Sequence, residues 1–253
     1  MRLLRLELLI ENGLAERLNS FALKAIHVSF AFREASFPAC KKEKRTQPPH
    51  FMASPNSHFL RAFLRNKSQV GALTPSGDKL ADAMVDWIDW SSVKSAVEFG
   101  PGTGVFTEKI LTRLRPDSKF FAVEQDEHLA DITRARCPGA RVHTDCVSNI
   151  SAICEKEEID KVDVVISGLP WAVFTPELQK ELLVEMKSVL KPGGKFVTFA
   201  YLQGMLLPAA QRFRKLLNDE FVDVHQSKVV WGNVPPAFVY RSVREDAPSM
   251  AAE

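Results

Sequence analysis

Cysteine is scarce in this chain of 253 residues, which contains four cysteines. Cys40, Cys137, Cys146 and Cys154 form no C-x-x-C pair. Structural zinc sites and disulfide frameworks both depend on closely patterned cysteines, so neither is expected. We predict reduced thiols, as in a cytoplasmic protein, and no metal site.

Long hydrophobic runs are also missing. No stretch reaches the roughly 18 apolar residues that a bilayer-spanning helix needs. The first ten residues lack the apolar core and cleavage site of a secretory signal, and Glu7, Glu11 and Glu16 argue against a transit peptide. Any membrane contact is therefore expected to be peripheral.

Carboxylates are few at the N-terminal end. The first 68 residues hold twelve Lys or Arg and five Glu, whereas the rest of the chain holds 21 basic and 26 acidic residues. An anionic partner is therefore expected to bind the basic end. We divide the chain into a poorly defined, disordered extension (1–51), a covering segment (52–92) and a main domain (93–245). Met52 is an alternative start of the functional protein.

The segment from Ser57 to Lys67 has the spacing of a short basic amphipathic helix. Its apolar residues share one helical face and its arginines lie together on another: Phe59, Leu60, Phe63 and Leu64, and Arg61 and Arg65. Such a helix either packs on the core or lies in the interface of an anionic membrane. Both interpretations stay open, and the second predicts a membrane-docking helix.

The most informative motif is Val97–Phe106, where an apolar run and Glu98 precede glycines at positions 100, 102 and 104. Glycine accepts a positive φ and lets the backbone approach a ligand. Glu98 would repel a pyrophosphate and attract a cation.

The loop resembles the cofactor loop of class I S-adenosylmethionine-dependent methyltransferases. That resemblance implies that Glu98 lies near the amino group of the methionine moiety. It also implies a set of loop residues that bind this cofactor: Gly100, Gly102, Thr103 and Gly104. An ordinary glycine-rich turn is the alternative.

Acidic residues also end the next two predicted strands. Glu124 closes the strand Lys119–Glu124, 26 residues after Glu98, a spacing that suits a carboxylate accepting both ribose hydroxyls. Asp145 follows a third strand, where this superfamily uses an Asp to accept the adenine amino group. A surface Glu without such a role is the alternative for Glu124.

A fourth strand from Lys161 is followed by Ser167-Gly168-Leu169-Pro170. Ligands bind at the carboxyl ends of parallel strands, so the four strand exits should meet at one cleft. We predict that Ser167, Leu169 and Pro170 act where the methyl group meets its acceptor, and that Ser167 also contacts the cofactor. Tyr201, at the end of a fifth strand, is a catalytic candidate; Tyr201, Ser167 and the Gly168 carbonyl are candidate proton acceptors.

Strands alternate with helices from Ala96 to Tyr201, which predicts an α/β doubly wound, Rossmann-like sheet covered by helices on both faces. The predicted helices include Asp78–Asp89 and a helix capped by Thr175, with Pro176 at its first position. Three closing strands are expected after the fifth: Phe221–Val224, Ser227–Trp231 and Ala237–Arg241.

The Ser167–Trp171 segment also bears on the substrate. Methyltransferases of exocyclic base amines resemble one another in an Asn or Asp followed by Pro-Pro or Leu-Pro and an aromatic residue. The amide or carboxylate accepts from the amine and the aromatic ring stacks on the base. This chain keeps Leu-Pro and an aromatic residue, Trp171, but has Ser-Gly in place of the acceptor. A nucleic-acid substrate is therefore disfavoured.

Four segments together carry a closer resemblance: FLRAFLRNKSQVGALTPSG, VEFGPGTGVFT, SGLPW and VPPAFVYR. They resemble the bacterial phospholipid N-methyltransferase family, itself similar to ribosomal RNA adenine dimethylases, over roughly Pro55 to Arg244. The resemblance implies a seven-stranded sheet, mostly parallel with an antiparallel edge strand, and an N-terminal helical extension. It implies S-adenosylmethionine as cofactor, with Gln69 among its contacts, and methylation of phosphatidylethanolamine or an ornithine lipid at the inner face of the membrane.

The expected reaction is direct transfer to the lipid amine after that amine loses a proton. Lys67 or Arg241 could bind the lipid phosphate, and a structural role for Arg241 is equally open. Two alternatives remain at this point. One is an rRNA adenine N6-methyltransferase, which needs a stacking aromatic residue and a basic RNA-binding region. The other is a non-catalytic protein that keeps the cofactor fold.

Overall fold

The computed structural model describes residues 75–245. The extension over residues 1–51, the predicted membrane helix with Phe59, Leu60, Arg61, Phe63, Leu64 and Arg65, and also Lys67 and Gln69, lie outside the described residues. They remain predictions. Within the described range, no helix is long and apolar enough to cross a membrane.

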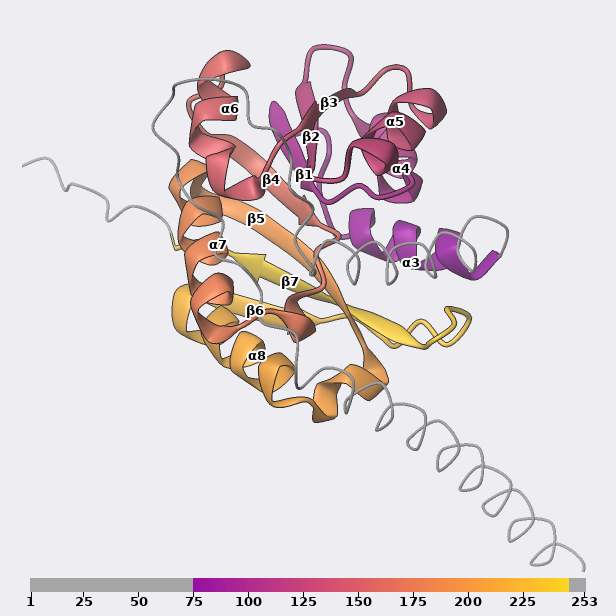
Figure 1. The fold of residues 1–253 in the computed structure, drawn as a ribbon, viewed down its shortest axis with the longest axis vertical. Coiled ribbons are helices and arrows are strands. Elements are labelled where there is room, and N and C mark those ends of the chain that lie inside the picture. The colour runs from indigo at the N-terminus through magenta and orange to yellow at the C-terminus, as the bar shows by residue number, and fades with distance from the viewer. Residues whose placement is uncertain (1–74, 246–253) are drawn as a thin grey trace, which may run out of the picture. The chain divides into compact units, whose positions relative to one another are not determined.

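Seven strands form one sheet in the order β3-β2-β1-β4-β5-β7-β6 (Figure 1). Their bounds are β1 Ser95–Phe99, β2 Lys119–Glu124, β3 Arg141–Thr144, β4 Val162–Ser167, β5 Leu190–Tyr201, β6 Asp223–Gln226 and β7 Ala237–Val243. The first five strands run parallel. Strand β7 is antiparallel to β5 and to the edge strand β6. The predicted doubly wound, mostly parallel sheet is confirmed.

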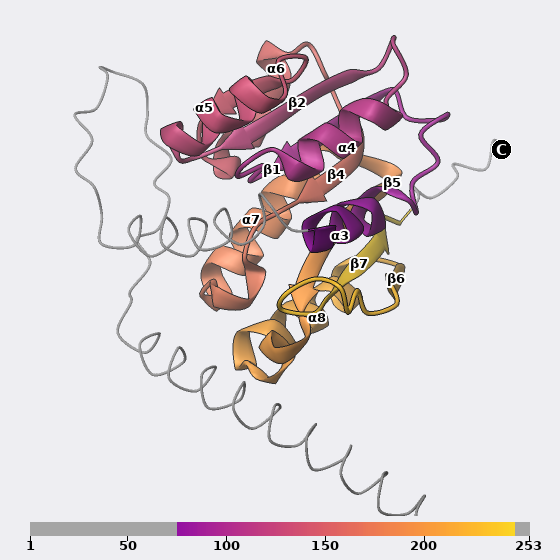
Figure 2. The same cartoon turned by 90° about the vertical axis from the view of Figure 1, so that its right-hand side faces the viewer.

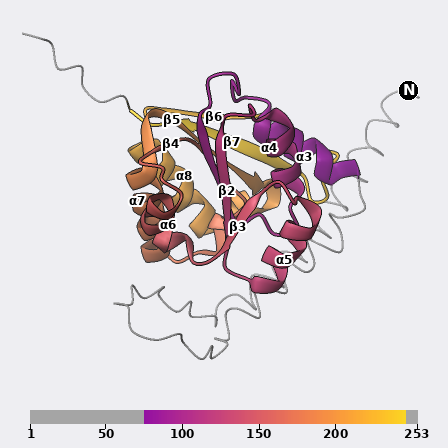
Figure 3. The same ribbon diagram turned by 90° about the horizontal axis from the view of Figure 1, so that it is seen from above.

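Helices cover both faces of the sheet (Figure 3). On one face lie α3 Pro75–Val85, α4 Val105–Arg113 and α5 Glu127–Arg136, and on the other α6 Ile150–Lys156, α7 Pro176–Val189 and α8 Pro208–Glu220. Short 3-10 turns complete the connections: η2 Val147–Asn149, η3 Trp171–Val173 and η4 Leu202–Leu206. This three-layer arrangement leaves the carboxyl ends of β1 to β5 along one edge.

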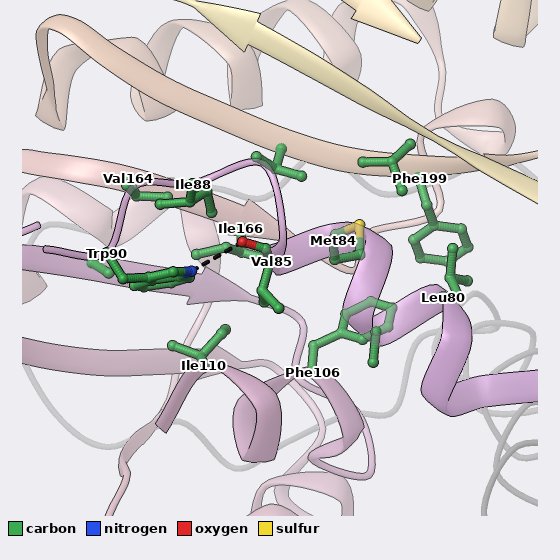
Figure 4. Close-up of a cluster of buried hydrophobic side chains, with 14 of the residues drawn as sticks. Leu80, Met84, Val85, Ile88, Trp90, Phe106, Ile110, Val164, Ile166 and Phe199 are labelled. Atoms are coloured by element: carbon green, nitrogen blue, oxygen red, sulfur yellow. Dashed lines mark hydrogen bonds between the residues drawn. The ribbon is translucent and has the colours of Figure 1, made fainter. Parts of the chain in front are cut away.

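The α3 side of the sheet has a continuous apolar core (Figure 4). Leu80 and Met84 of α3 are buried together with Phe106 and Ile110 of α4 and residues of β1, β4, β5 and β7. The Trp90 indole N–H donates to the Val85 carbonyl at 3.0 Å and fixes the chain after α3. Figure 2 shows α3 beside α4 and β7. The end of the covering segment therefore shares one core with the main domain.

Local sequence signals explain several boundaries. Thr175 caps α7 by accepting from the Leu178 N–H at 3.3 Å, with Pro176 at the first position, as predicted. The predicted strand Ser227–Trp231 is wrong, because Val230 makes only an isolated bridge to Ala237. The Ser227 hydroxyl accepts the Val239 N–H at 2.9 Å, so a side chain replaces a backbone carbonyl in the ladder.

The cysteines depart from expectation at one position. Cys137 and Cys154 are free and buried, and burial raises the pKa of each thiol to about 11. Cys146 is disulfide-bonded, so the prediction of reduced thiols is wrong for that residue. Within residues 75–245 no cluster of three metal-binding side chains occurs.

Candidate functional site at the carboxyl edge of the sheet

The sheet register places the predicted site segments side by side. Phe99, the last residue of β1, pairs with Val123 of β2 and with Ser167 of β4. Glu124 pairs with Thr144 of β3. The residues that follow these strands therefore share one edge, and they are the glycine turn, Asp145 and the Gly168 turn. The convergence of four strand exits is confirmed.

The glycine turn adopts the conformation that its sequence requires. Gly100, Gly102 and Gly104 have φ angles of 67°, 62° and 81°, in the left-handed region. The Gly100 N–H donates to the Val123 carbonyl at 2.9 Å, which anchors the turn to β2. Among the described residues, no atom would lie within 4 Å of a Cβ on Gly102. Thr103 lies between these glycines and is half-buried.

Glu98 is fully buried on the α4 side of β1. The Thr107 hydroxyl donates to Glu98 Oε2 at 2.6 Å, so the first turn of α4 orients the carboxylate. Thr107 is not among the site residues predicted from the sequence. A threonine in the first turn after the glycine loop, nine residues from the acid, is the signal that could have found it.

The Glu124 side chain is hydrogen-bonded to the same glycine turn. Its Oε2 accepts the Gly102 N–H at 3.0 Å and its Oε1 accepts the Asp126 N–H at 3.1 Å. Burial raises the pKa of this carboxyl, and the two backbone N–H groups oppose that shift. Thr133 of α5 supports the arrangement by donating to the Gly102 carbonyl at 2.8 Å. A carboxylate rather than a phosphate thus uses the Gly102 N–H.

Asp145 directly follows β3 and is half-buried. Its N–H donates to the Glu124 carbonyl at 3.1 Å, which joins the exits of β2 and β3. Its Oδ1 accepts both the Cys146 N–H and the Asn149 amide, each at 2.7 Å. Neither bond uses Oδ2.

The turn after β4 packs directly on the glycine turn. The Gly168 N–H donates to the Phe99 carbonyl at 2.7 Å. A Cβ at Gly168 would stand 2.4 Å from the Gly100 carbonyl oxygen, and a Cβ at Gly100 would stand 2.9 Å from Leu169 Cδ2. Such distances are too short for real side chains, so this contact requires glycine at position 168. Leu169 and Pro170 are half-buried beside it.

Ser167 and Trp171 close this turn from the α7–α8 side. The buried Ser167 hydroxyl oxygen accepts the Leu169 N–H at 3.3 Å and the Trp171 indole N–H at 3.1 Å. Trp171 is 3% exposed and stacks on Phe213 of α8, with ring centroids 4.5 Å apart. These two bonds occupy both lone pairs of the hydroxyl. Trp171 is a core residue here.

The backbone carbonyls of this turn differ in their partners. Ser167 O accepts the Thr198 hydroxyl, Leu169 O the Trp171 N–H and Pro170 O the Val173 N–H, each at 3.0 Å. Among the described residues, no group donates to the Gly168 carbonyl oxygen. The Gly168 carbonyl is therefore the acceptor that this turn leaves available.

Tyr201 does not lie beside the Ser167 hydroxyl. It is three residues beyond Thr198, the β5 partner of Ser167, or about 10 Å along the strand. Its side chain packs against the α3-side core, and its ring lies edge-on to Phe199, whereas Ser167 faces α7 and α8. Burial raises the pKa of the Tyr201 phenol to about 12, so the phenol stays protonated at neutral pH.

Arg241 has a structural contact. It lies within β7, paired with Val197 rather than at the carboxyl end of β5. Its Nη2 donates to the Ala83 carbonyl of α3 at 3.2 Å, and burial lowers the pKa of its guanidinium. The structural interpretation of Arg241 fits this position.

Comparisons with known proteins identify relatives of this chain. A family described as "Methyltransferase domain" matches residues 96–194. The ornithine lipid N-methyltransferase of Singulisphaera acidiphila is 32% identical over 193 residues, which cover 74% of this chain and 96% of the relative. A dimethyladenosine transferase of Yarrowia lipolytica is 32% identical over 103 residues, covering 41% of this chain and 31% of that protein.

Solved structures share the fold. The O-methyltransferase from Bacillus cereus, solved in complex with SAH, matches with a TM-score of 0.55 at 14% identity, covering 77% of this chain and 94% of that one. Magnesium protoporphyrin IX methyltransferase from Synechocystis, solved with bound SAM, matches with a TM-score of 0.54 at 12% identity, covering 76% and 92%.

Proposed function

This chain belongs to the class I S-adenosylmethionine-dependent methyltransferases, and we propose that it methylates the amine of a membrane lipid, an ornithine lipid or phosphatidylethanolamine. The observation that carries the proposal is the match to an ornithine lipid N-methyltransferase over 96% of that protein. The shorter match to a dimethyladenosine transferase covers 31% of that relative. The lipid amine is therefore the favoured acceptor.

The residues at the carboxyl edge fit S-adenosylmethionine. A buried carboxylate, Glu98, suits the cationic methionine end, and the positive φ angles of the glycine turn suit a close approach of its backbone to the cofactor. Glu124 already takes the Gly102 N–H that a pyrophosphate would need, which argues against a dinucleotide. We assign the ribose to Glu124 and the adenine amino group to Asp145 Oδ2. When bound, the cofactor supplies an activated methyl group on a sulfonium.

Two features of the turn after β4 argue against a base amine as acceptor. Gly168 occupies the place of the Asn or Asp in the base-methyltransferase pattern, and a Cβ there would meet Gly100 O at 2.4 Å. Trp171, in the place of the stacking aromatic residue, is buried against Phe213. Neither the acceptor side chain nor the stacking ring is thus available to an adenine.

The chain's own groups suggest how an amine would be held. The Gly168 carbonyl oxygen can accept a hydrogen bond from the attacking amine and so aim its lone pair. Leu169 and Pro170 would exclude water beside it. Ser167, with both lone pairs in use, is assigned to holding the turn. Tyr201 is assigned to orienting the acceptor through its hydroxyl, since its raised pKa keeps it protonated. Water would carry the departing proton.

The test is methyl transfer from labelled S-adenosylmethionine to separate acceptors: ornithine lipid, phosphatidylethanolamine and ribosomal RNA. We expect label in lipid and none in RNA. The Glu98→Gln variant serves as the cofactor-site control and should transfer far less. Label in RNA alone would support the adenine methyltransferase instead. Label in no acceptor, with the cofactor still bound, would support the non-catalytic alternative.

A further inference from the structure

Four exposed apolar side chains gather at the carboxyl end of β5. Leu202 and Leu206, in η4, are 38% and 80% exposed. Trp231 and Val234, in the connection from β6 to β7, are 70% and 60% exposed. Large apolar groups this exposed at one place mark an interaction surface. We call these four residues the rim surface.

The two segments of the rim surface are joined by hydrogen bonds. The Leu202 N–H donates to the Pro236 carbonyl at 2.9 Å, and Val230 bridges to Ala237, which pairs with Tyr201 at the end of β5. Figure 1 shows this connection, in yellow, at the start of β7 beside the end of β5. The rim surface therefore lies along the same edge as the proposed acceptor site.

The two segments that carry the rim surface hold basic residues and no acidic ones. Residues 202–218 and 227–236 contain no Asp or Glu, and they include Arg212 and Lys228, both exposed. Within the described part of the chain, neither cation forms an ion pair. Exposed apolar groups flanked by unpaired cations match an anionic lipid surface, whose head groups attract Lys and Arg and whose interface accommodates Trp.

We propose that the rim surface docks the protein on an anionic lipid bilayer, with Trp231 and Leu206 inserted at the level of the head groups. The inference rests on the proposed function, because a lipid amine must reach the carboxyl edge without leaving its membrane. Docking on this edge would bring the head group to Gly168. The bilayer contact would thus come from the catalytic fold itself, in addition to any contact through residues 57–67.

Trp231 offers its own spectroscopic readout. The chain has four tryptophans, and the other three are buried or half-buried: Trp87, Trp90 and Trp171. Insertion of an exposed indole into lipid shifts its emission to shorter wavelength and exposes it to quenchers attached to acyl chains. The emission that is lost in a Trp231→Phe variant is the contribution of Trp231.

The test uses the full chain with vesicles of phosphatidylcholine alone or mixed equally with phosphatidylglycerol. We expect a blue shift of the Trp231 emission on the mixed vesicles, weakened by salt. Trp231→Ala and Leu206→Gln should each weaken binding about tenfold or more, since each removes a large apolar contact. Arg212→Glu and Lys228→Glu should each weaken it about tenfold.

Val222→Gln is the matched control. The exposed fraction of Val222, 62%, is similar to the 60% of Val234. Val222 lies at the opposite end of β5, however, because its N–H donates to the Val243 carbonyl at the amino end of that strand. It should bind vesicles like the parent protein. Melting temperatures of all variants check that these surface changes leave the fold intact.

Two results would overturn the docking surface: an unshifted Trp231 emission on vesicles that the protein binds, or binding lost only when Arg61 and Arg65 are changed to Glu. If the rim surface binds a protein partner instead of a bilayer, the Trp231 emission would also stay unshifted on vesicles. The proposed function is tested separately by methyl transfer to lipid dispersed in detergent, which needs no vesicle. Absence of transfer there contradicts the function and leaves the docking result unchanged.

Discussion

Glu98 is the residue on which cofactor binding should depend most. Its carboxylate is buried and oriented by Thr107 at 2.6 Å. We predict that Glu98→Gln weakens S-adenosylhomocysteine binding about 30-fold or more, because it removes the buried negative charge that we propose binds the methionine ammonium. Isothermal titration calorimetry measures this directly.

Thr107→Val provides the graded comparison for that prediction. Valine has nearly the shape of threonine but removes the hydrogen bond, so we expect a loss of about tenfold or less. Equal affinity of Glu98→Gln and the parent protein would show that the cofactor ammonium binds elsewhere.

Tyr201 gives a prediction about pH. Burial raises the pKa of its phenol to about 12, so it remains protonated between about pH 6 and 10. The rate should rise with pH as the substrate amine loses its proton. We predict that Tyr201→Phe lowers the rate about tenfold or less through a lost hydrogen bond, without moving the midpoint of this profile. A shifted midpoint would identify Tyr201 as the proton acceptor.

At the scale of elements, two glycines of the glycine turn allow the energetic cost of backbone strain to be compared with the cost of a steric clash. Gly100 and Gly102 have similar positive φ angles, but only Gly100 would place its Cβ on Leu169. We predict that Gly102→Ala lowers the free energy of unfolding by roughly 1 to 2 kcal/mol, the cost of a left-handed alanine. Gly100→Ala should cost more. Urea unfolding of both variants measures the difference, and equal losses would contradict the contact.

At the amino end of the sheet, Asp163 joins strands β1 and β4. Its Oδ2 accepts the N–H groups of Lys94 and Ser95, each at 2.8 Å, and its Oδ1 pairs with Lys191 Nζ at 2.6 Å. Burial raises the pKa of this carboxyl, but Lys191 and the two N–H groups outweigh it, and the net pKa is lowered.

A lowered folded-state pKa means that the ionised carboxylate stabilises the fold above the ordinary value of 3.8, and that this contribution is lost as pH falls. We predict that Asp163→Asn lowers the free energy of unfolding by about 2 kcal/mol at pH 7. The gap between the two proteins should close below the ordinary carboxyl pKa. Denaturant unfolding at a series of pH values tests this, and a gap independent of pH would exclude the charge as its cause.

The elements differ in how far the sequence predicts them. The positive φ angles at Gly100, Gly102 and Gly104 follow from local composition, and the cap at Thr175 follows from a local signal. The strand predicted at Ser227–Trp231 does not form, because the Val239 N–H donates to the Ser227 hydroxyl and not to a backbone carbonyl. This hydrogen bond depends on Val239, which is distant from Ser227 in the sequence. The hydrogen bond from Thr107 to Glu98 depends on the packing of α4, and the burial of Trp171 depends on the packing of α8. A single sequence reveals neither.

At the scale of the whole molecule, cofactor binding and stability are linked. The proposed site joins β1, β2, β3 and α4, so a bound cofactor favours the folded state over the unfolded chain. At a concentration 100 times the Kd, S-adenosylhomocysteine should stabilise the protein by about 2.7 kcal/mol, or roughly 5 to 10 °C in Tm. Differential scanning fluorimetry should show this shift, and Glu98→Gln should remove most of it. A shift of the same size in both proteins would contradict the site.

The contact between Gly168 and Gly100 has a consequence for the evolution and redesign of acceptor choice. A side chain at position 168 cannot be introduced while the Gly100 carbonyl stays 2.4 Å from its Cβ. Converting this turn to an Asn-containing, base-methylating sequence would therefore require compensating changes in the glycine turn. If the acceptor and the cofactor bind as we propose, we expect substitutions that change acceptor specificity to affect cofactor affinity as well, and single substitutions between the two substrate classes to pass through inactive intermediates.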